Sequence, residues 1–130
     1  MSSINSKEME SVVRLSGSKR YGYFIKRVVD MEKLWSLRNQ DGWVLASDPS
    51  GNQVVPVWSH TEYAKLCIND EWSNCYPGFI DLRDWMNKWI PGMINDKRKI
   101  AVFPTIVSKG VVVDPQKLLN DLNEELSLIE

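Results

Sequence analysis

Apolar residues recur at helical spacing in the first part of the chain. Residues 5–16 place a few apolar side chains among polar ones, which predicts a short amphipathic helix that Gly17 should end. From Ser18 onward the i, i+3, i+4, i+7 spacing indicates a second helix. Its apolar stripe consists of Tyr21, Phe24, Ile25 and Val28. We expect residues 1–17 to form a short, mobile N-terminal helix and residues 18–130 to form one domain.

From residue 34 the period of the pattern changes to two. Residues 34–38 and 43–47 alternate between apolar and polar, with a turn signal at 39–42 between them, which predicts a hairpin. A second turn signal at 48–52 precedes a third alternating run. We therefore expect a three-stranded antiparallel meander. Because Pro56 has no amide hydrogen, its strand should lie at an edge or carry a bulge.

The second half of the chain alternates between helix and strand signals. Ser59 and Glu62 match a capping box for a helix to about residue 68, and an irregular loop follows at 69–78. Asp81 should cap a further helix, which the Pro91-Gly92 pair should kink or end. Residues 100–107 and 110–113 read as a second hairpin, and a last helix should begin at Pro115 behind Asp114.

This order of elements predicts the fold class. Strands in antiparallel groups, with helices between and after them, are typical of α+β proteins. We expect a single domain with a mainly antiparallel or mixed sheet, made of the three-stranded meander plus the C-terminal hairpin and packed by about four helices.

Composition excludes several classes of function. The 130 residues carry 16 Lys and Arg against 17 Asp and Glu, so no excess of positive charge favours general nucleic-acid binding. Basic pairs such as Lys19-Arg20 read as solvated helix ends. No apolar run reaches the about 18–20 residues of a membrane span, and no targeting segment opens the sequence, so we expect a cytoplasmic protein.

Cysteine and histidine are too few for most cofactor chemistry. Cys67 and Cys75 should remain free thiols in a reducing compartment. Together with one His they do not make a zinc site, so we expect no metal and no cofactor. His60 is the only candidate for His-based catalysis, and Cys67 on the same predicted helix would lie about 10.5 Å away along the axis. A direct Cys–His pair needs about 3 Å, and a pairing with Cys75 depends on the path of the loop.

The acidic residues also have structural explanations. Turns, helix caps and first helical turns account for the Asp residues at 41, 48, 81 and 84. We therefore expect a protein that is not an enzyme.

One of the six Trp residues stands apart from the others. Five fit core or helix-staple positions, whereas Trp72 lies in the irregular loop, close to Asp70, Glu71 and Tyr76. Rigid aromatic and polar groups in this mixture are typical of protein-binding surfaces. The alternative is that Trp72 folds back and closes the end of the core.

Several segments together carry a resemblance to a known family. They resemble a bacterial family of small proteins known as domain of unknown function 2750, over roughly residues 18–128, in the family's order. The segment at 55–62 is also similar, more weakly, to the enhanced-serine-sensitivity protein family, an α+β scaffold for interaction. The first resemblance implies no activity, and the second argues only for a fold. The segments are RYGYFIK (20–26), WSLRNQDGW (35–43), VPVWSHTEYAK (55–65), EW (71–72), KWIPG (88–92), AVFP (101–104) and GVVV (110–113).

Two hypotheses of function follow from the sequence. The leading one is a non-catalytic cytoplasmic module that binds another protein, in a regulatory or toxin-neutralising role. Its candidate partner-binding residues are Trp72, Tyr76, Asp70, Glu71 and His60. The rival is a small-molecule-binding protein or hydrolase with a pocket near His60 and the 69–78 loop. The sequence leaves the partner and the oligomeric state open.

Overall fold

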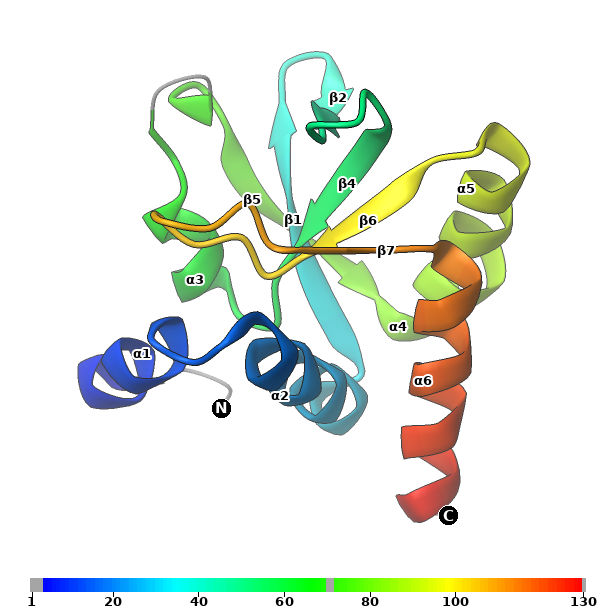
Figure 1. The fold of residues 1–130 in the computed structure, drawn as a ribbon, viewed down its shortest axis with the longest axis horizontal. Helices are drawn as coiled ribbons and strands as arrows, with labels where there is room; N and C mark the ends of the chain where they lie inside the picture. Colours follow the sequence, from blue (N-terminus) through cyan, green and yellow to red (C-terminus); the bar gives the residue numbers. More distant parts are fainter. Residues whose placement is uncertain (1–3, 70–71, 130) are drawn as a thin grey trace.

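A sheet in two parts, flanked by helices, organises the molecule (Figure 1). The computed structural model describes residues 4–69 and 72–129. Helices and strands alternate in the predicted manner, and the α+β fold class is confirmed. The elements are α1 (Ser6–Val13), α2 (Gly17–Met31), β1 (Lys33–Asn39), β2 (Gly42–Trp43), β3 (Ala46–Ser47), β4 (Gln53–Val57), α3 (Thr61–Leu66), β5 (Tyr76–Asp81), α4 (Leu82–Asp84), η2 (Trp85–Trp89), α5 (Ile90–Asp96), β6 (Lys99–Val102), β7 (Val111–Val113) and α6 (Pro115–Ile129).

Two ladders of strands meet at a pair of Trp residues. One sheet has the order β2-β1-β5 and is antiparallel throughout; the other has the order β3-β4-β6-β7, with β4 and β6 parallel. An antiparallel bridge joins them, in which the amides of Trp35 and Trp58 each donate to the carbonyl of the other at 2.8 Å. The β1–β2 and β3–β4 pairs of the predicted meander both form, but they belong to different sheets.

The strand of Pro56 is not at an edge, contrary to the prediction. β4 lies between β3 and β6, and Pro56 pairs with Ala101 without a bulge. The amide of Phe103 donates to the carbonyl of Val57, so Val57 turns its backbone toward β6 and Pro56 turns away from it. On that other side β3 reaches only as far as Val54, and the carbonyl of Pro56 accepts the hydroxyl of Ser36 at 2.6 Å. The missing amide hydrogen of Pro56 therefore leaves no ladder bond unmade.

The core lies between the sheets and the helices. α2 packs against β1, β7 and α6, α5 packs beside α6, and apolar residues of these helices and of the strands share one buried cluster. The largest fully buried side chains are Trp58, Trp85, Tyr63, Phe24 and Phe103. Large aromatic residues thus fill much of the core, but of the five Trp residues expected at core or helix-staple positions only Trp58 and Trp85 are fully buried.

Helix boundaries follow the predicted signals with three differences. Gly17 begins α2 rather than ending α1, because the Ser16 side chain accepts the amide of Lys19 and so caps α2. Asp81 caps α4 as predicted, accepting the amides of Arg83 and Asp84. The two other differences concern Pro91 and the cap of α3.

Of the two outcomes predicted at Pro91-Gly92, a kink or an end, the end does not occur, because the helical segment after Asp81 passes through Pro91. A π turn over Trp85–Trp89 directly precedes it, and the amide of Ile90 donates to the carbonyl of Trp85, five residues back. In a regular α-helix the proline ring would clash with the carbonyl four residues back. The wider turn before Pro91 changes this geometry, and α5 continues to Asp96.

No helix in the described ranges combines the length and the apolar character that crossing a membrane requires.

Candidate functional site

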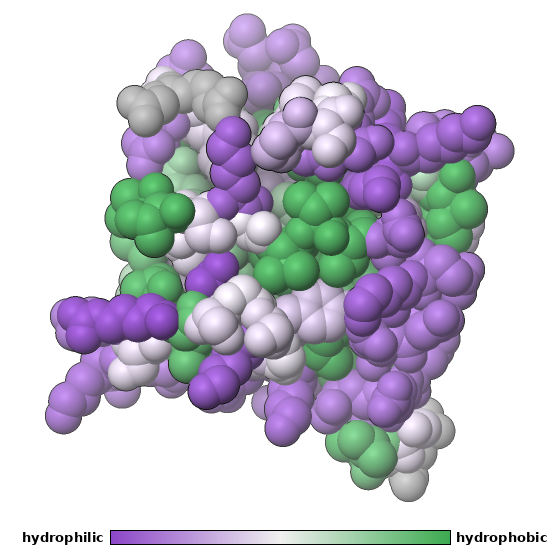
Figure 2. Space-filling model, viewed as in Figure 1, coloured by the Kyte–Doolittle hydropathy of each residue, from purple (hydrophilic) through white to green (hydrophobic). Residues whose placement is uncertain are grey.

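A pocket of about 460 Å³ opens on the outer face of the four-stranded sheet. We call it the sheet-face pocket. Residues that alternate with the core positions of β4, β6 and β7 form its floor: Val54, Pro56, Ala101 and Val112. Figure 2 shows apolar side chains gathered at the centre of this face, with hydrophilic residues around them. The floor of the pocket is therefore a sheet face that no helix of the described residues lines.

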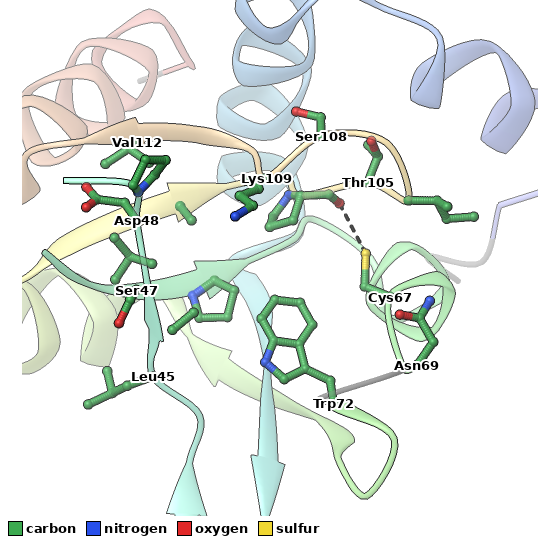
Figure 3. A pocket seen from close by; sticks show the side chains of 17 residues that line it. Leu45, Ser47, Asp48, Cys67, Asn69, Trp72, Thr105, Ser108, Lys109 and Val112 are labelled. Atoms are coloured by element: carbon green, nitrogen blue, oxygen red, sulfur yellow. Dashed lines mark hydrogen bonds between the residues drawn. The ribbon is translucent and has the colours of Figure 1, made fainter. Parts of the chain in front are cut away.

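Three segments wall the sheet-face pocket (Figure 3). Leu45, Ser47 and Asp48 lie on one side, and Trp72 and Cys67 lie on the opposite side. The loop at 104–109 forms the third wall. The walls combine a broad aromatic ring, a thiol and several polar groups.

From the sequence, Trp72 could lie on a binding surface or close the end of the core, and in the structure it does both in part. Its ring packs edge to face on the fully buried ring of Trp58, with the centroids 6.2 Å apart, and it is partly buried against the core. The same residue lines the sheet-face pocket. Trp72 thus closes one end of the core with part of its surface and lines the pocket with another part.

Of the other predicted residues in the 69–78 loop, only Tyr76 is described, and it does not join Trp72 in the pocket. Tyr76 lies in β5, opposite Arg38 of β1, is exposed, and is not among the residues lining this pocket. Asp70 and Glu71 lie outside the described residues. Asn69, which was not singled out from the sequence, lines the pocket beside Trp72.

A buried arginine, Arg20, contacts the 104–109 loop that forms the third wall. Arg20 was expected at a solvated helix end, but it is only 6% exposed. Its Nη1 donates to the carbonyl of Leu15 at 2.5 Å and its Nη2 to the hydroxyl of Ser108 at 3.2 Å. The contact joins residues 88 positions apart, so no local spacing could have predicted it. Ser108 and its neighbour Lys109 line the pocket.

The thiols are poorly suited to nucleophilic chemistry. Burial raises the pKa of Cys67 to about 11, and its Sγ donates to the carbonyl of Pro104 at 3.4 Å. Burial also raises the pKa of Cys75. Both cysteines are free, and neither has the lowered pKa that activates a catalytic cysteine.

Asp48, the acidic residue that lines the sheet-face pocket, is hydrogen-bonded within its own turn. The Asp48 carboxylate accepts the side-chain amide of Asn52 and the backbone amides of Asn52 and Ser50. These hydrogen bonds, that of the Asn52 side chain foremost, lower the pKa of Asp48. The residue serves the turn that the Asp-Pro-Ser-Gly-Asn sequence predicted.

A second, apolar hollow of about 280 Å³ lies beside the first. We call it the helix hollow, because it is lined by Val13 of α1, by Arg14 directly after that helix, and by Tyr63 and Leu66 of α3. Pro104, Thr105 and Ile106 line both cavities. The segment 104–107, which we call the ridge, therefore separates the two cavities.

Two apolar side chains of the ridge point into solvent. Ile106 is 72% exposed and Val107 is 91% exposed. Residues 103–107 were expected in a strand, but β6 ends at Val102 and Phe103 has a left-handed φ of 59°, so the chain leaves the sheet there. The exposure of the ridge follows from that departure, which the apolar pattern did not indicate.

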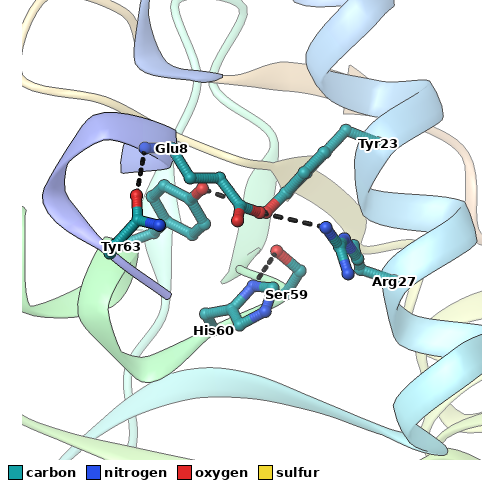
Figure 4. A network of polar contacts seen from close by, with 7 residues as sticks. Glu8, Tyr23, Arg27, Ser59, His60 and Tyr63 are labelled. Carbon is teal, nitrogen blue, oxygen red and sulfur yellow. Dashed lines mark hydrogen bonds and ion pairs between the residues drawn. The ribbon is translucent and has the colours of Figure 1, made fainter. Parts of the chain in front are cut away.

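His60 lies apart from both cavities, in a polar network (Figure 4). It is 3% exposed and its Nδ1 contacts the hydroxyl of Ser59 at 2.9 Å. The predicted capping box is wrong: His60 is the N-cap of α3, without a side-chain cap bond, because the Ser59 hydroxyl is engaged by the imidazole. Burial lowers the pKa of His60, with the neighbouring Glu62 acting in the opposite direction.

The rest of this network ties α1 to the domain. The hydroxyl of Tyr23 donates to the Glu8 carboxylate at 2.7 Å and lies 3.0 Å from the hydroxyl of Tyr63. Arg27 forms an ion pair with the same carboxylate at 3.1 Å. The residues around His60 thus have structural partners, and the structure does not bring His60 together with Trp72 in either cavity.

Potential metal ligands do not cluster in the described ranges. No group of three or more His, Cys, Asp or Glu residues there could hold a metal ion.

The comparisons with known proteins identify a family. A family model described as Protein of unknown function (DUF2750) matches residues 21–122, which is most of the chain. This match confirms the first resemblance in the sequence, while the weaker similarity to the enhanced-serine-sensitivity family stays a prediction. Among curated proteins, none gives a significant match.

Proposed function

We propose that this chain, which belongs to the DUF2750 family, is a non-catalytic module that binds another protein. The binding surface consists of the sheet-face pocket and the ridge beside it. The exposure of the ridge carries the proposal. Ile106 lines both cavities and Val107 lines the helix hollow, yet they are 72% and 91% exposed, so a small molecule inside a cavity would leave much of both side chains in water. A contiguous apolar surface of this kind is covered well only by a larger partner.

The chemistry of the pocket supports binding rather than catalysis. A catalytic site needs a nucleophile or an acid–base pair with a shifted pKa and a suitable geometry. Of the described groups in the pocket, Cys67 has a raised pKa and Asp48 is held by its turn. Free thiols also favour a reducing compartment, so we place the module in the cytoplasm.

Site-specific crosslinking in the source cells tests the protein-binding proposal. A photoreactive amino acid at Val107 should give a discrete crosslinked protein, and the same group at Asn123, on the exposed face of α6, should not. Ile106→Asp should remove that product. Leu128→Asp is the matched control, because Leu128 is 73% exposed and Ile106 is 72% exposed. A product that survives Ile106→Asp, or the absence of any product at Val107, would contradict the proposal.

The volume of the sheet-face pocket favours a second candidate, a small-molecule binder. About 460 Å³ lies within the range of small-ligand sites, roughly 300–1,000 Å³. This candidate now centres on Trp72 and no longer on His60, which lines neither cavity. A thermal-shift screen with a metabolite panel should then find a ligand whose effect Trp72→Ala abolishes and His60→Ala preserves. A panel without any shift would count against this candidate.

A further inference from the structure

Three cations surround the ridge, and none of them pairs with a described acid. Arg14 lines the helix hollow, Lys109 lines the sheet-face pocket, and Arg20 is buried behind the ridge loop. The ion pairs of residues 4–69 and 72–129 involve other Lys and Arg residues. Asp48, on the far wall of the sheet-face pocket, is engaged by Asn52 and Ser50. Among the described residues, the ridge is therefore flanked by cations without an ion-pair partner, in a chain with a formal charge of −1.

The contacts of Ser108 add a directed donor to this charge. Its hydroxyl oxygen accepts from Nη2 of Arg20 and from the amide of Gly110, both at 3.2 Å. A hydroxyl oxygen has two lone pairs and one hydrogen, so with both lone pairs occupied the hydrogen is left to donate. Ser108 lines the sheet-face pocket, where its donor would meet an acceptor group of a ligand.

Apolar surface separates these donors. Ile106 and Val107 form the crest of the ridge, and the helix hollow below it is lined mainly by apolar side chains. Figure 2 shows the ridge side as a second apolar cluster next to hydrophilic residues. A partner that satisfies both features must bring apolar side chains and negative charge together.

We infer that the partner crosses the ridge with an acidic, apolar peptide segment. Apolar side chains of this segment enter the sheet-face pocket and the helix hollow, and its carboxylates meet Lys109, Ser108 and Arg14. The inference rests on the proposed protein-binding function and specifies the chemistry of the partner. A nucleic acid would supply negative charge but no aliphatic groups for the crest at Ile106 and Val107.

Peptide titrations of the isotopically labelled full chain test this inference. The probe is a short capped peptide in which Leu and Glu alternate in pairs, and its two controls replace every Glu with Gln or with Lys. At low salt the Glu peptide should shift the amide signals of residues 103–110 and the indole signal of Trp72. The Gln peptide should bind several-fold more weakly, and the Lys peptide should leave these signals in place. Raising the salt should weaken the Glu peptide selectively.

Charge reversal on the protein provides the matched variants. Lys109→Glu and Arg14→Glu should each weaken the Glu peptide by about two- to five-fold or more, as expected for exposed ion pairs, and should strengthen the Lys peptide. Lys26→Glu, an exposed position on α2 that lines neither cavity, should change neither affinity. Equal binding of the Glu and Gln peptides, or no shift with any peptide, would overturn the inference. A single-stranded oligonucleotide that shifts the same signals as strongly as the Glu peptide would also overturn it.

The outcome of the peptide titrations can be distinguished from the outcome of the crosslinking test of the proposed function. If the Val107 crosslink forms and disappears in Ile106→Asp while the Glu peptide has no advantage over the Gln peptide, the protein-binding function stands and the acidic partner is wrong. If no crosslink depends on Ile106, the function itself is wrong, whatever the peptides do.

Discussion

Gly78 of β5 lies where two neighbouring side chains leave no room for a third. A Cβ atom at this position would be 2.9 Å from both Cδ of Arg38 and Cη2 of Trp43. The Arg38 guanidinium lies over the Trp43 ring at 4.8 Å, and Trp89 packs edge to face with that ring at 4.9 Å between centroids. Neither side chain can move away freely.

Gly78→Ala should therefore destabilise the protein by about 1–3 kcal/mol, as overpacking does. Gly22→Ala is the control, because Gly22 lies inside α2 and a Cβ there meets nothing within 4 Å. It should stabilise by about 0.5–1 kcal/mol through the higher helix propensity of Ala. Urea denaturation of the two variants measures both effects, and an equal sign for the two would contradict the packing argument.

His60 predicts a dependence of stability on pH. Burial lowers its folded-state pKa below the ordinary value of about 6.5, so the unfolded chain takes up the proton more readily. The contribution of His60 is complete above the unfolded-state pKa and is lost as the pH falls from there through the lowered folded-state pKa. Below that point the contribution no longer changes.

The comparison of wild type with His60→Asn isolates this effect, since Asn is a good N-cap for α3 and does not titrate. The free energy of unfolding should fall more steeply for the wild type than for the variant as the pH decreases below about 6.5. Denaturation series at closely spaced pH values give both slopes. Parallel curves for the two proteins would show that His60 does not titrate with folding.

At the scale of elements, α1 depends on a few contacts for its place. Val12 is buried, and the Glu8 carboxylate accepts from Tyr23 and pairs with Arg27 of α2. Val13 of α1 and Arg14 directly after it line the helix hollow, so the docking of α1 shapes one of the two cavities. The predicted separate N-terminal helix is thus part of a candidate site.

Glu8→Ala should loosen α1 without unfolding the domain. The two contacts of the Glu8 carboxylate contribute about 0.5–1.5 kcal/mol each, so the amides of α1 should exchange with solvent about fivefold faster or more. Hydrogen exchange followed by NMR measures this effect, and the amides of α6 serve as the internal reference. Unchanged protection of α1 would mean that Val12 and its apolar neighbours hold the helix alone.

Local sequence signals predicted most of the helices and strands. The arrangement of the strands in the two sheets depends on non-local contacts, which these signals do not contain. Asp81 and Pro115 begin helices as predicted, because capping depends on neighbours in sequence. The central place of β4 depends on pairing with β6, more than forty residues later, which a period of two cannot specify. For the same reason the pattern indicated strands on both sides of the bridge but not the division of the meander between two sheets.

The candidate site was predictable only in part. Trp72 stood out because it matched no helix or strand pattern, and it does line a cavity. Arg20 and Ser108 could not be paired from the sequence, and the exposed crest of the ridge was hidden in an apolar run that resembled a strand. Apolar periodicity reports which residues can be buried, but it does not report which of them remain exposed.

At the scale of the whole molecule, Trp58 connects the sheets, the ridge and the pocket. Its backbone makes the bridge to Trp35, its Nε1 donates to the carbonyl of Pro104 at 2.8 Å, and its ring supports Trp72. Pro104 begins the ridge and also accepts the thiol of Cys67. A change at Trp58 should therefore reach the candidate binding surface as well as the core.

Trp58→Phe should keep the backbone bridge but remove the indole hydrogen bond and leave a small void. We expect a loss of about 1–3 kcal/mol in the free energy of unfolding and faster exchange for the amides of residues 103–107 in particular. Trp89→Phe is the control, because the described contacts of Trp89 are with Trp43 and Trp85, outside the ridge. It should lower stability without changing exchange at the ridge. Equal protection of the ridge amides in both variants would show that the indole of Trp58 does not position the ridge. The shape of the two cavities would then depend on the contact between Arg20 and Ser108.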